Sequence, residues 1–218
     1  MKVLVLSEGN SIHTQRWCES LAKSGVEVLL FTLRIARTDW FDGRKVSVFS
    51  AGLDVQGSAR LWCKARYLCA VVKIWQAIKT FKPDIVHAHY ASSYGLLGAL
   101  AGFHPYVVSV WGSDVYEFPR ANWLAKQVIR FVFRRADYLL STSHVMAREA
   151  ARYTDKHFAI TPFGVDLQRF SRVLGVEYDA NLIGTIKTLR PKYGIDVLIK
   201  AFALCVERNL GRPLRLYI

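Results

Sequence analysis

Polar residues that can do chemistry follow two short apolar runs in the middle of the chain. The first run reads DIVHAHY and carries His87 and His89, and the second reads YVVSVWGSD and ends in Gly112, Ser113 and Asp114. An imidazole can bind a ligand or move a proton, and a carboxylate can accept a hydrogen bond from a hydroxyl group. Both runs have the β-branched composition of strands buried on both faces of a parallel sheet. Ligands of such sheets bind beyond the carboxyl ends of the strands, so we expect these residues to line one mouth.

His87 and His89 are two residues apart on a predicted strand and therefore share one face. Two interpretations stay open, a buried hydrogen-bonded pair or a His89 that faces a ligand. A metal site would need further ligands, and because no acidic cluster suggests one, no metal is predicted. We take His89 and Asp114 as the candidate catalytic residues. Asp114 could instead cap the turn that follows it, and Gly112 would permit close approach of a ligand.

Two further groups of candidates carry positive charge. His13 stands where a short loop meets the start of a predicted helix, and the free N–H groups and dipole there favour an anion such as a phosphate. A surface cap is the alternative for His13. In the last part of the chain, Lys187, Arg190 and Lys192 form either a solvated loop or a clamp for a diphosphate.

Alternating strands and helices must position these residues. Strands are predicted at 2–7, 26–32, 45–50, 84–88, 106–111, 137–142 and 158–161. Helices are predicted from Ser11 or Thr14 to about Ser24 and at 58–81, 94–101, 122–135 and 143–153, the last with Ser143 as its cap. Parallel strands need crossover helices, so the alternation predicts a doubly wound, Rossmann-like α/β domain with about six or seven parallel strands.

The segment PFGVD at residues 162–166 interrupts this alternation. We place the first domain at residues 1–165, a linker at 166–175 and the beginning of a second α/β domain at 176–218. In that last segment a strand is predicted at 182–187, a helix at 195–208 and a strand at 214–218. These elements cannot close a sheet or bury a core of their own, so we expect the larger part of the second domain to be missing.

The composition indicates a globular protein. Of the 218 residues, 52% are hydrophobic, which is ample for a core and excludes a disordered or coiled-coil chain. Neither an apolar run long enough to span a membrane nor a signal-peptide cleavage site is found, so the expected compartment is the cytosol. The cysteines lack CxxC spacing, and we predict buried free thiols for them. They are Cys18, Cys63, Cys69 and Cys205.

The formal net charge of +13 is distributed unevenly. Residues 60–82 hold six Lys or Arg and residues 120–135 hold five, and neither stretch contains an acid. Such a surface attracts phosphate in a nucleic acid, an anionic lipid or a nucleotide-sugar. No zinc-finger, basic-zipper or RNA-binding signature is present, so nucleic acid is not predicted. The helix at 122–135 could contact the inner face of an anionic membrane peripherally, or it could be an ordinary solvated helix.

Five segments, in order along the chain, resemble one enzyme family. They read SIHTQRWCESLAKSGVEV, KPDIVHAHY, VVSVWGSDVY, TPFGVDLQRF and IGTIKTLRPKYGIDVLIKAFA. Together they make the chain similar to retaining glycosyltransferases of the GT-B fold, a family that includes bacterial enzymes acting on glycans and lipids. The resemblance implies an N-terminal domain that binds a glycan or lipid-linked acceptor. It also implies a C-terminal domain that binds most of the nucleotide-sugar, with no cofactor besides that co-substrate.

The resemblance also implies roles for single residues. Acceptor binding is implied for His13, Arg16, Trp111, Gly112 and Ser113. Contact with the donor diphosphate is implied for Gly9, Asn10, Lys187, Arg190 and Lys192.

The chain departs from the family pattern at several positions. Many relatives have two glycines where this chain has Gly9-Asn10, and many have a histidine where it has Trp111. The usual base-like histidine is thus not available at that position. Thr188 and Tyr193 stand where relatives offer an Arg and a Lys to the diphosphate, and the paired glutamates that hold the donor sugar belong to a region downstream of residue 218.

Retaining transfer of a sugar requires few catalytic side chains. As the sugar–phosphate bond breaks, negative charge grows on the diphosphate, and fixed cations there stabilise the transition state. A leaving phosphate oxygen can take the proton of the acceptor.

From the resemblance and the incomplete second domain we predict a truncated glycosyltransferase that is inactive alone. The alternative is a non-catalytic module of the same fold that binds a glycan or an anionic membrane. A dinucleotide oxidoreductase is less favoured because the first strand is followed by SEGNSIHT, which lacks the Gly-x-Gly-x-x-Gly turn.

Overall fold

The computed structural model divides into two compact units, Met1–Gly164 and Val165–Ile218. It describes residues 1–37, 40–41, 45–53, 61–171, 175, 177, 179–208, 211 and 213–218. For residues 61–68 and for Lys192 only the backbone is described.

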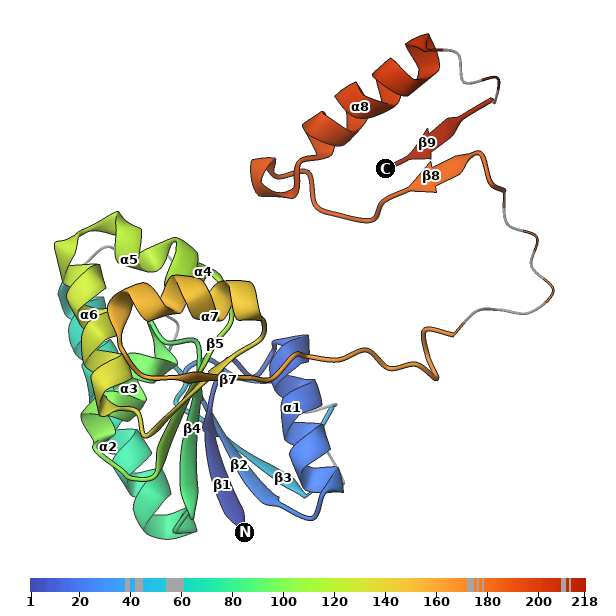
Figure 1. The fold of residues 1–218 in the computed structure, drawn as a ribbon. Helices are drawn as coiled ribbons and strands as arrows, with labels where there is room; N and C mark the ends of the chain where they lie inside the picture. Colours follow the sequence, from blue (N-terminus) through green and yellow to red (C-terminus); the bar gives the residue numbers. More distant parts are fainter. Residues whose placement is uncertain are drawn as a thin grey trace. The chain divides into compact units, whose positions relative to one another are not determined.

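The first unit is built on a seven-stranded sheet in which every pairing is parallel. The strands are β1 (Lys2–Leu6), β2 (Glu27–Thr32), β3 (Val46–Ser50), β4 (Ile85–His89), β5 (Tyr106–Val110), β6 (Tyr138–Ser141) and β7 (Phe158–Ile160). Their order in the sheet is β3-β2-β1-β4-β5-β6-β7, so the chain winds outward in both directions from β1 and β4 (Figure 1). The prediction of a doubly wound parallel sheet is confirmed.

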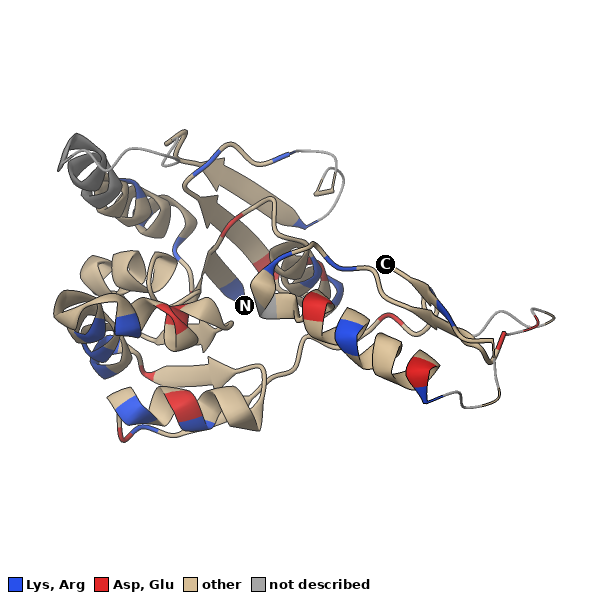
Figure 2. Cartoon of the chain, turned by 90° about the horizontal axis from the view of Figure 1, so that it is seen from above, with Lys and Arg blue, Asp and Glu red and all other residues tan. Residues whose placement is uncertain are grey.

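Helices connect most of the parallel strands. They are α1 (Ile12–Lys23), α2 (Leu61–Phe81), α3 (Tyr94–Ala101), α4 (Ser113–Tyr116), α5 (Phe118–Ala121), α6 (Trp123–Arg135) and α7 (His144–Ala150), which a 3₁₀ turn η1 (Ala151–Tyr153) extends. Between β2 and β3 the described residues form no helix. The basic segment at 120–135 includes α6. Figure 2 colours the ribbon blue at the Lys and Arg positions of the chain. Residues 58–60, where the prediction begins α2, lie outside the described residues.

The helix ends follow local capping chemistry. The Asn122 side chain accepts a hydrogen bond from the Ala125 N–H, and Ser143 accepts one from Met146. Gly102, in the left-handed conformation with φ 71°, ends α3. Ser11 occupies the N-cap position of α1, but its side chain makes no capping hydrogen bond. The prediction missed α4 and α5, because four-residue helices are too short to show a 3.6-residue period.

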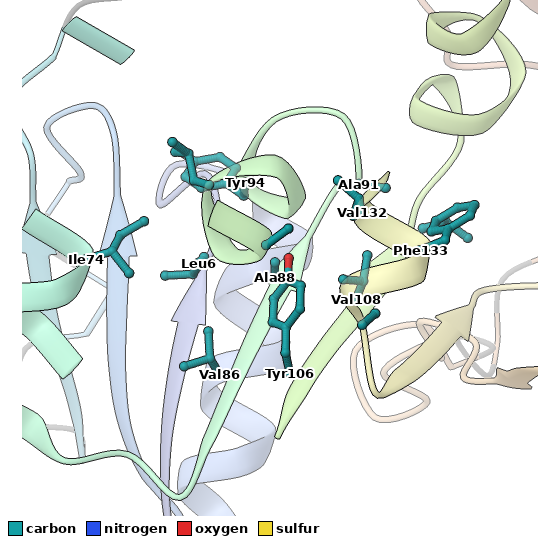
Figure 3. Packing of buried hydrophobic residues seen from close by; sticks show 14 of the residues in the cluster. Leu6, Ile74, Val86, Ala88, Ala91, Tyr94, Tyr106, Val108, Val132 and Phe133 are labelled. Atoms are coloured by element: carbon teal, nitrogen blue, oxygen red, sulfur yellow. The ribbon is translucent and has the colours of Figure 1, made fainter. Parts of the chain in front are cut away.

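Two apolar clusters hold the layers together. The larger one joins β1, β4 and β5 to α2, α3 and α6, and Figure 3 shows part of it. It includes Leu6, Ile74, Val86, Tyr106 and Phe133. The smaller cluster lies between α1 and strands β1 to β3 and includes Val5, Cys18 and Leu30. The sheet is thus covered on both faces, as a parallel sheet requires.

The second unit is a single βαβ element. Strand β8 (Leu182–Gly184) pairs in parallel with β9 (Arg215–Tyr217), and α8 (Ile195–Glu207) lies between them in the sequence, after a 3₁₀ turn η2 (Pro191–Tyr193). The observed β8 is shorter than the predicted strand at 182–187. Many large apolar side chains of this unit are exposed, including Ile186, Leu189, Val197 and Leu204.

The cysteines only partly match the prediction. Cys18, Cys69 and Cys205 are free thiols, but Cys18 alone among them is buried, while Cys205 is half-buried and Cys69 is exposed. The prediction of burial was wrong for Cys69 because a small apolar residue in a helix fits either face. The side chain of Cys63 lies outside the described part. No described helix is long and apolar enough to cross a bilayer.

Gly98 leaves space for a buried ring. A Cβ atom at this position would lie 2.6 Å from the hydroxyl oxygen and ring of Tyr106, which is 1% exposed and donates a hydrogen bond to the Gly95 carbonyl. We expect Gly98→Ala to lower the free energy of unfolding by about 1–3 kcal/mol, because the ring cannot withdraw from a packed core. Urea denaturation measures this change. Gly184→Ala, whose Cβ meets nothing within 4 Å, is the control and should leave the transition of the first unit unchanged.

Candidate functional site

The register of three strands brings polar side chains together at the carboxyl end of the sheet. Leu6 of β1 pairs with Ala88 of β4, and His89 of β4 pairs with Ser109 of β5. Ser7 directly follows β1, so its side chain reaches the same place. The mouth expected from the sequence is therefore formed between β1, β4 and β5.

Each histidine of β4 is hydrogen-bonded to a serine. His87 Nε2 lies 2.7 Å from Ser109 Oγ, and His89 Nδ1 lies 3.1 Å from Ser7 Oγ. Ser7 Oγ in turn lies 2.7 Å from the Thr14 hydroxyl on α1. The two imidazole rings pack edge to face with centroids 4.6 Å apart. They are a buried pair, but their hydrogen bonds go to neighbouring strands and not to each other.

Burial keeps both imidazoles neutral at physiological pH. His87 is 6% exposed, and its burial lowers the pKa of the imidazole to about 4. His89 is fully buried, and desolvation, with a smaller effect from His87, holds its pKa well below 6.5. His89 Nε2 is buried and has no hydrogen-bond partner within the described structure. The hydrogen-bonding capacity of this nitrogen is therefore unused within the described structure.

A cavity of about 360 Å³ lies beside His89. It is lined by Ser7, Glu8, Ser11, His89, Tyr90, Ser93, Tyr94 and Trp111. The Trp111 ring lies 4.5 Å from the His89 ring, centroid to centroid. Aromatic walls with a few hydroxyl and carboxylate groups suit a ligand that is apolar on its faces and polar at its edges, which is the character of a sugar ring.

An aromatic stack closes the mouth next to this cavity. The His13 ring stacks on Phe163 with centroids 4.1 Å apart, and Trp111 contacts Phe163 edge to face at 5.1 Å. Arg16 and His13 line a neighbouring hollow of about 150 Å³ together with Trp17. Partial burial, with a smaller contribution from Arg16, lowers the pKa of His13. The structure thus brings His13, Arg16 and Trp111 to one end of the sheet, and acceptor binding by these residues stays a prediction.

Asp114 is fully buried, and backbone groups take up both of its carboxylate oxygens. Oδ1 accepts from the N–H groups of Gly112 at 2.8 Å and Trp111 at 3.1 Å, and Oδ2 accepts from Ala91 at 2.9 Å. Desolvation raises the pKa of Asp114 in spite of these hydrogen bonds. The carboxylate ties the segment after β4 to the segment after β5. The hydrogen bonds run to Trp111, Gly112 and Ala91, so the carboxylate fixes these segments and does not cap the turn that follows it.

The loop after β5 has a strained start. Gly112 has φ 141°, a conformation that L side chains rarely adopt, and it is followed at once by α4. Ser113 Oγ hydrogen-bonds the hydroxyl of Tyr90, a residue that itself has φ 75°. Gly112 and Ser113 therefore shape the mouth near Trp111.

The structure gives Gly9 and Asn10 local packing roles. A Cβ on Gly9 would lie 2.7 Å from Ala36 Cβ, so the glycine allows the segment after β2 to approach. The Asn10 side chain donates to the Ile35 carbonyl and accepts from the Arg37 N–H. Both residues hold the loop that carries Glu8.

The remaining donor candidates lie in the second unit. The Lys187 ammonium lies 5.4 Å from the centroid of the Tyr193 ring, and Arg190 precedes η2. The side chain of Lys192 is outside the described part. In the described segments no group of three His, Cys, Asp or Glu side chains is arranged to hold a metal ion.

Sequence reasoning missed several residues of the site. Ser7 carried a usable signal, because a polar residue follows the apolar run VLVL just as His89 follows IVHA. Thr14, Trp17 and Phe163 carried none, since their contacts depend on how α1 and the end of β7 approach the strand ends.

Comparison with known proteins places this geometry in context. The family model described as "Glycosyl transferase 4-like" matches residues 2–143. The Bacillus subtilis (strain 168) protein TuaC, which carries the name of a teichuronic acid biosynthesis glycosyltransferase, is 31% identical over 142 residues, covering 57% of this chain and 36% of TuaC. A D-inositol 3-phosphate glycosyltransferase of Actinosynnema mirum is 26% identical over 246 aligned residues, covering 96% of this chain and 57% of that protein. The chain thus spans between about a third and three fifths of the length of these curated relatives.

Solved structures show the same fold. Anabaena HepE, crystallised in complex with UDP and glucose, superposes with a TM-score of 0.68 at 16% identity, over 94% of this chain and 58% of HepE. Sucrose-phosphate synthase from Thermosynechococcus elongatus superposes with a TM-score of 0.72 at 16% identity, over 94% of this chain and 60% of that one.

The buried histidines predict a pH-dependent stability. An unfolded chain protonates His87 near pH 6.5, whereas the folded protein protonates it near pH 4. Between these two pH values the unfolded state binds more protons than the folded state. The free energy of unfolding therefore decreases as the pH falls from 6.5 toward 4, by about 3 kcal/mol for His87. His89 adds a change of the same sign.

Urea denaturation between pH 7.5 and pH 4 measures this loss. The free energy of unfolding of the variant His87→Gln/His89→Gln should depend less steeply on pH than that of the wild type. The difference between the two curves gives the contribution of the two imidazoles, separate from that of other titrating groups. Gln168→Ala, at an exposed position without a titrating group, is the control and should keep the wild-type slope. Direct titration of the His87 imidazole by NMR with a pKa near 6.5 would contradict the prediction.

Proposed function

The chain belongs to the glycosyl transferase 4-like family, and on that premise we propose that it serves retaining transfer of a sugar from a nucleoside-diphosphate sugar to a glycan or lipid-linked acceptor. In this proposal residues 1–165 bind the acceptor, 166–175 are a linker, and 176–218 begin the domain that binds the donor. We place the reaction in the cytoplasm, at the inner face of the membrane when the acceptor is lipid-linked.

The observation that carries the acceptor site is the unpaired Nε2 of His89. Buried polar atoms in proteins are nearly always hydrogen-bonded, so an unpaired nitrogen beside a cavity is suited to a ligand group. The imidazole is neutral, and it can therefore contact a sugar hydroxyl without the cost of a buried charge. The Ser7 hydroxyl at Nδ1 holds the ring in place.

The remaining cavity walls complement this contact. Trp111 offers an aromatic face, while Glu8 and Ser11 offer polar groups at the edge of the cavity. A tryptophan at this position replaces the histidine that many relatives have, so stacking substitutes for a second imidazole. Asp114 acts as a positioning residue, because its oxygens fix the loops from which Ala91 and Trp111 extend.

The transfer step needs no side chain as a covalent partner. The bond between the sugar C1 and the diphosphate oxygen breaks, a bond from C1 to the acceptor oxygen forms on the same face, and the acceptor proton passes to the leaving phosphate oxygen. His89 orients the acceptor hydroxyl. Lys187 and Arg190 are the candidates that stabilise the charge growing on the diphosphate. The complex of HepE with UDP and glucose supports a uridine nucleotide as the first donor to test.

Glycan binding to the first unit tests the acceptor site. Trp17 and Trp111 lie at the mouth, so a bound saccharide should change the tryptophan fluorescence of the protein. We expect His89→Ala to weaken binding about tenfold, the effect of losing one net hydrogen bond of about 1–1.5 kcal/mol. His157→Ala is the matched control and should bind normally. If no member of a panel of soluble and lipid-derived glycans binds, the proposed acceptor site is wrong.

Turnover of the 218-residue chain gives a second prediction. The second unit has a two-stranded sheet and exposed apolar side chains, so it should hold a donor too loosely for efficient positioning. We expect less than about 1 turnover per second with UDP-, GDP- or ADP-sugars, measured as released nucleotide. Faster turnover would refute this expectation. Glycan binding that persists without any transfer, even at high enzyme concentration, would favour the non-catalytic module.

A further inference from the structure

Two bulky apolar side chains are exposed together at the start of α6. Trp123 is 73% exposed and Leu124 is 65% exposed, although both belong to a regular helix of the first unit. The buried side of the same helix is formed by Ala125, Ile129, Val132 and Phe133. Trp123 and Leu124 are therefore not part of the core.

Cations accompany this pair along the exposed side of the helix. Trp123, Arg130 and Arg134 are separated by seven and four residues, a spacing that places them on one line along the helix axis. Lys126, three residues after Trp123, lies on the adjoining side. We call Trp123, Leu124, Lys126, Arg130 and Arg134 the α6 face.

The charge of this face is largely uncompensated. In the described residues no carboxylate forms an ion pair with Lys126, Arg130 or Arg134. The acid nearest in sequence is Asp137, three residues after Arg134, and its carboxylate bonds His104 and the Tyr106 N–H. Glu117 is exposed before α5, and Glu149 pairs with Arg120 and Arg152. The surface therefore combines an apolar anchor with positive charge, which is complementary to an anionic lipid headgroup layer.

The face lies at the end of the fold that carries the candidate site. The segment from β5 to α6 leaves the sheet at Val110, passes Trp111 and Asp114, and reaches Trp123 through α4 and α5. Figure 1 shows α4, α5 and the start of α6 at the end of the sheet where β5 terminates. A bilayer that touches Trp123 would thus lie near the mouth that contains His89.

We propose that the α6 face docks the first unit on an anionic bilayer, with Trp123 and Leu124 at the level of the headgroups and Lys126, Arg130 and Arg134 against lipid phosphates. The docking itself is inferred from the α6 face alone. Its purpose, which is to deliver a lipid-linked acceptor to the mouth, rests on the proposed function. Each Lys or Arg near an anionic surface strengthens association about fivefold, so three such residues provide a reversible attachment.

Vesicle co-sedimentation tests the docking. The protein should bind vesicles of equal parts phosphatidylcholine and phosphatidylglycerol at low salt, bind them much more weakly at high salt, and not bind pure phosphatidylcholine. Lys126→Gln/Arg130→Gln/Arg134→Gln should weaken binding about a hundredfold. Trp123→Ala/Leu124→Ala should weaken it about tenfold and leave the salt dependence in place.

A charge-matched control separates the α6 face from general positive charge. Lys23→Gln/Lys45→Gln/Lys200→Gln removes three cations at exposed positions elsewhere and should retain most of the binding. Equal loss in the control and the α6 variant, or no loss with Trp123→Ala/Leu124→Ala, would overturn the proposal. The proposal would also be overturned if the protein bound no vesicles but formed a concentration-dependent dimer that the α6 substitutions abolish. In that case the α6 face would contact a second copy of the chain.

The outcome is independent of the acceptor site. His89→Ala should bind anionic vesicles like the wild type, so loss of glycan binding with normal docking contradicts only the proposed function. Absence of docking by a protein that still binds glycans contradicts only the α6 face. Equal urea midpoints of the α6 and control variants, expected because their positions lie outside the core, show that the fold is retained.

Discussion

The parallel pairing of β1, β4 and β5 is the constraint on which the rest of the first unit depends. It places Ser7 beside His89 and Ser109 beside His87, and it brings Trp111 to the same mouth. The same register buries the alternate residues of these strands in the two apolar clusters. A slip of one residue would turn the histidines of β4 to the opposite face, so the forces that form the core also fix the site.

Hydrogen-bond satisfaction separates the two residues that the sequence singled out as catalytic. The Asp114 carboxylate is buried but meets backbone N–H groups on both oxygens, and it thereby fixes the loops around it. His89 is equally buried, yet only its Nδ1 meets a partner in the described structure. An unpaired buried polar atom costs free energy, which a hydrogen bond to a ligand would recover. Asp114 is therefore suited to positioning the loops, and His89 is suited to contact with a ligand.

Helix direction explains why the candidate site and the α6 face lie at one end of the fold. In a parallel sheet each crossover helix runs opposite to the strands, so helices begin where strands end. The start of α1 thus contributes His13 and Thr14 to the mouth, and the start of α6 presents Trp123 near the same end.

The sequence by itself determined the element order, the parallel doubly wound sheet and the cap Ser143, because period and capping are local properties of the chain. It also placed His89 and Trp111 at strand ends. Only the tertiary structure decided that Phe163 stacks on His13, that Gly9 gives clearance to Ala36, and that Trp123 is exposed while Ile129 is buried. Such contacts join segments far apart in the chain, and they depend on the distances between packed elements, which a local pattern does not contain.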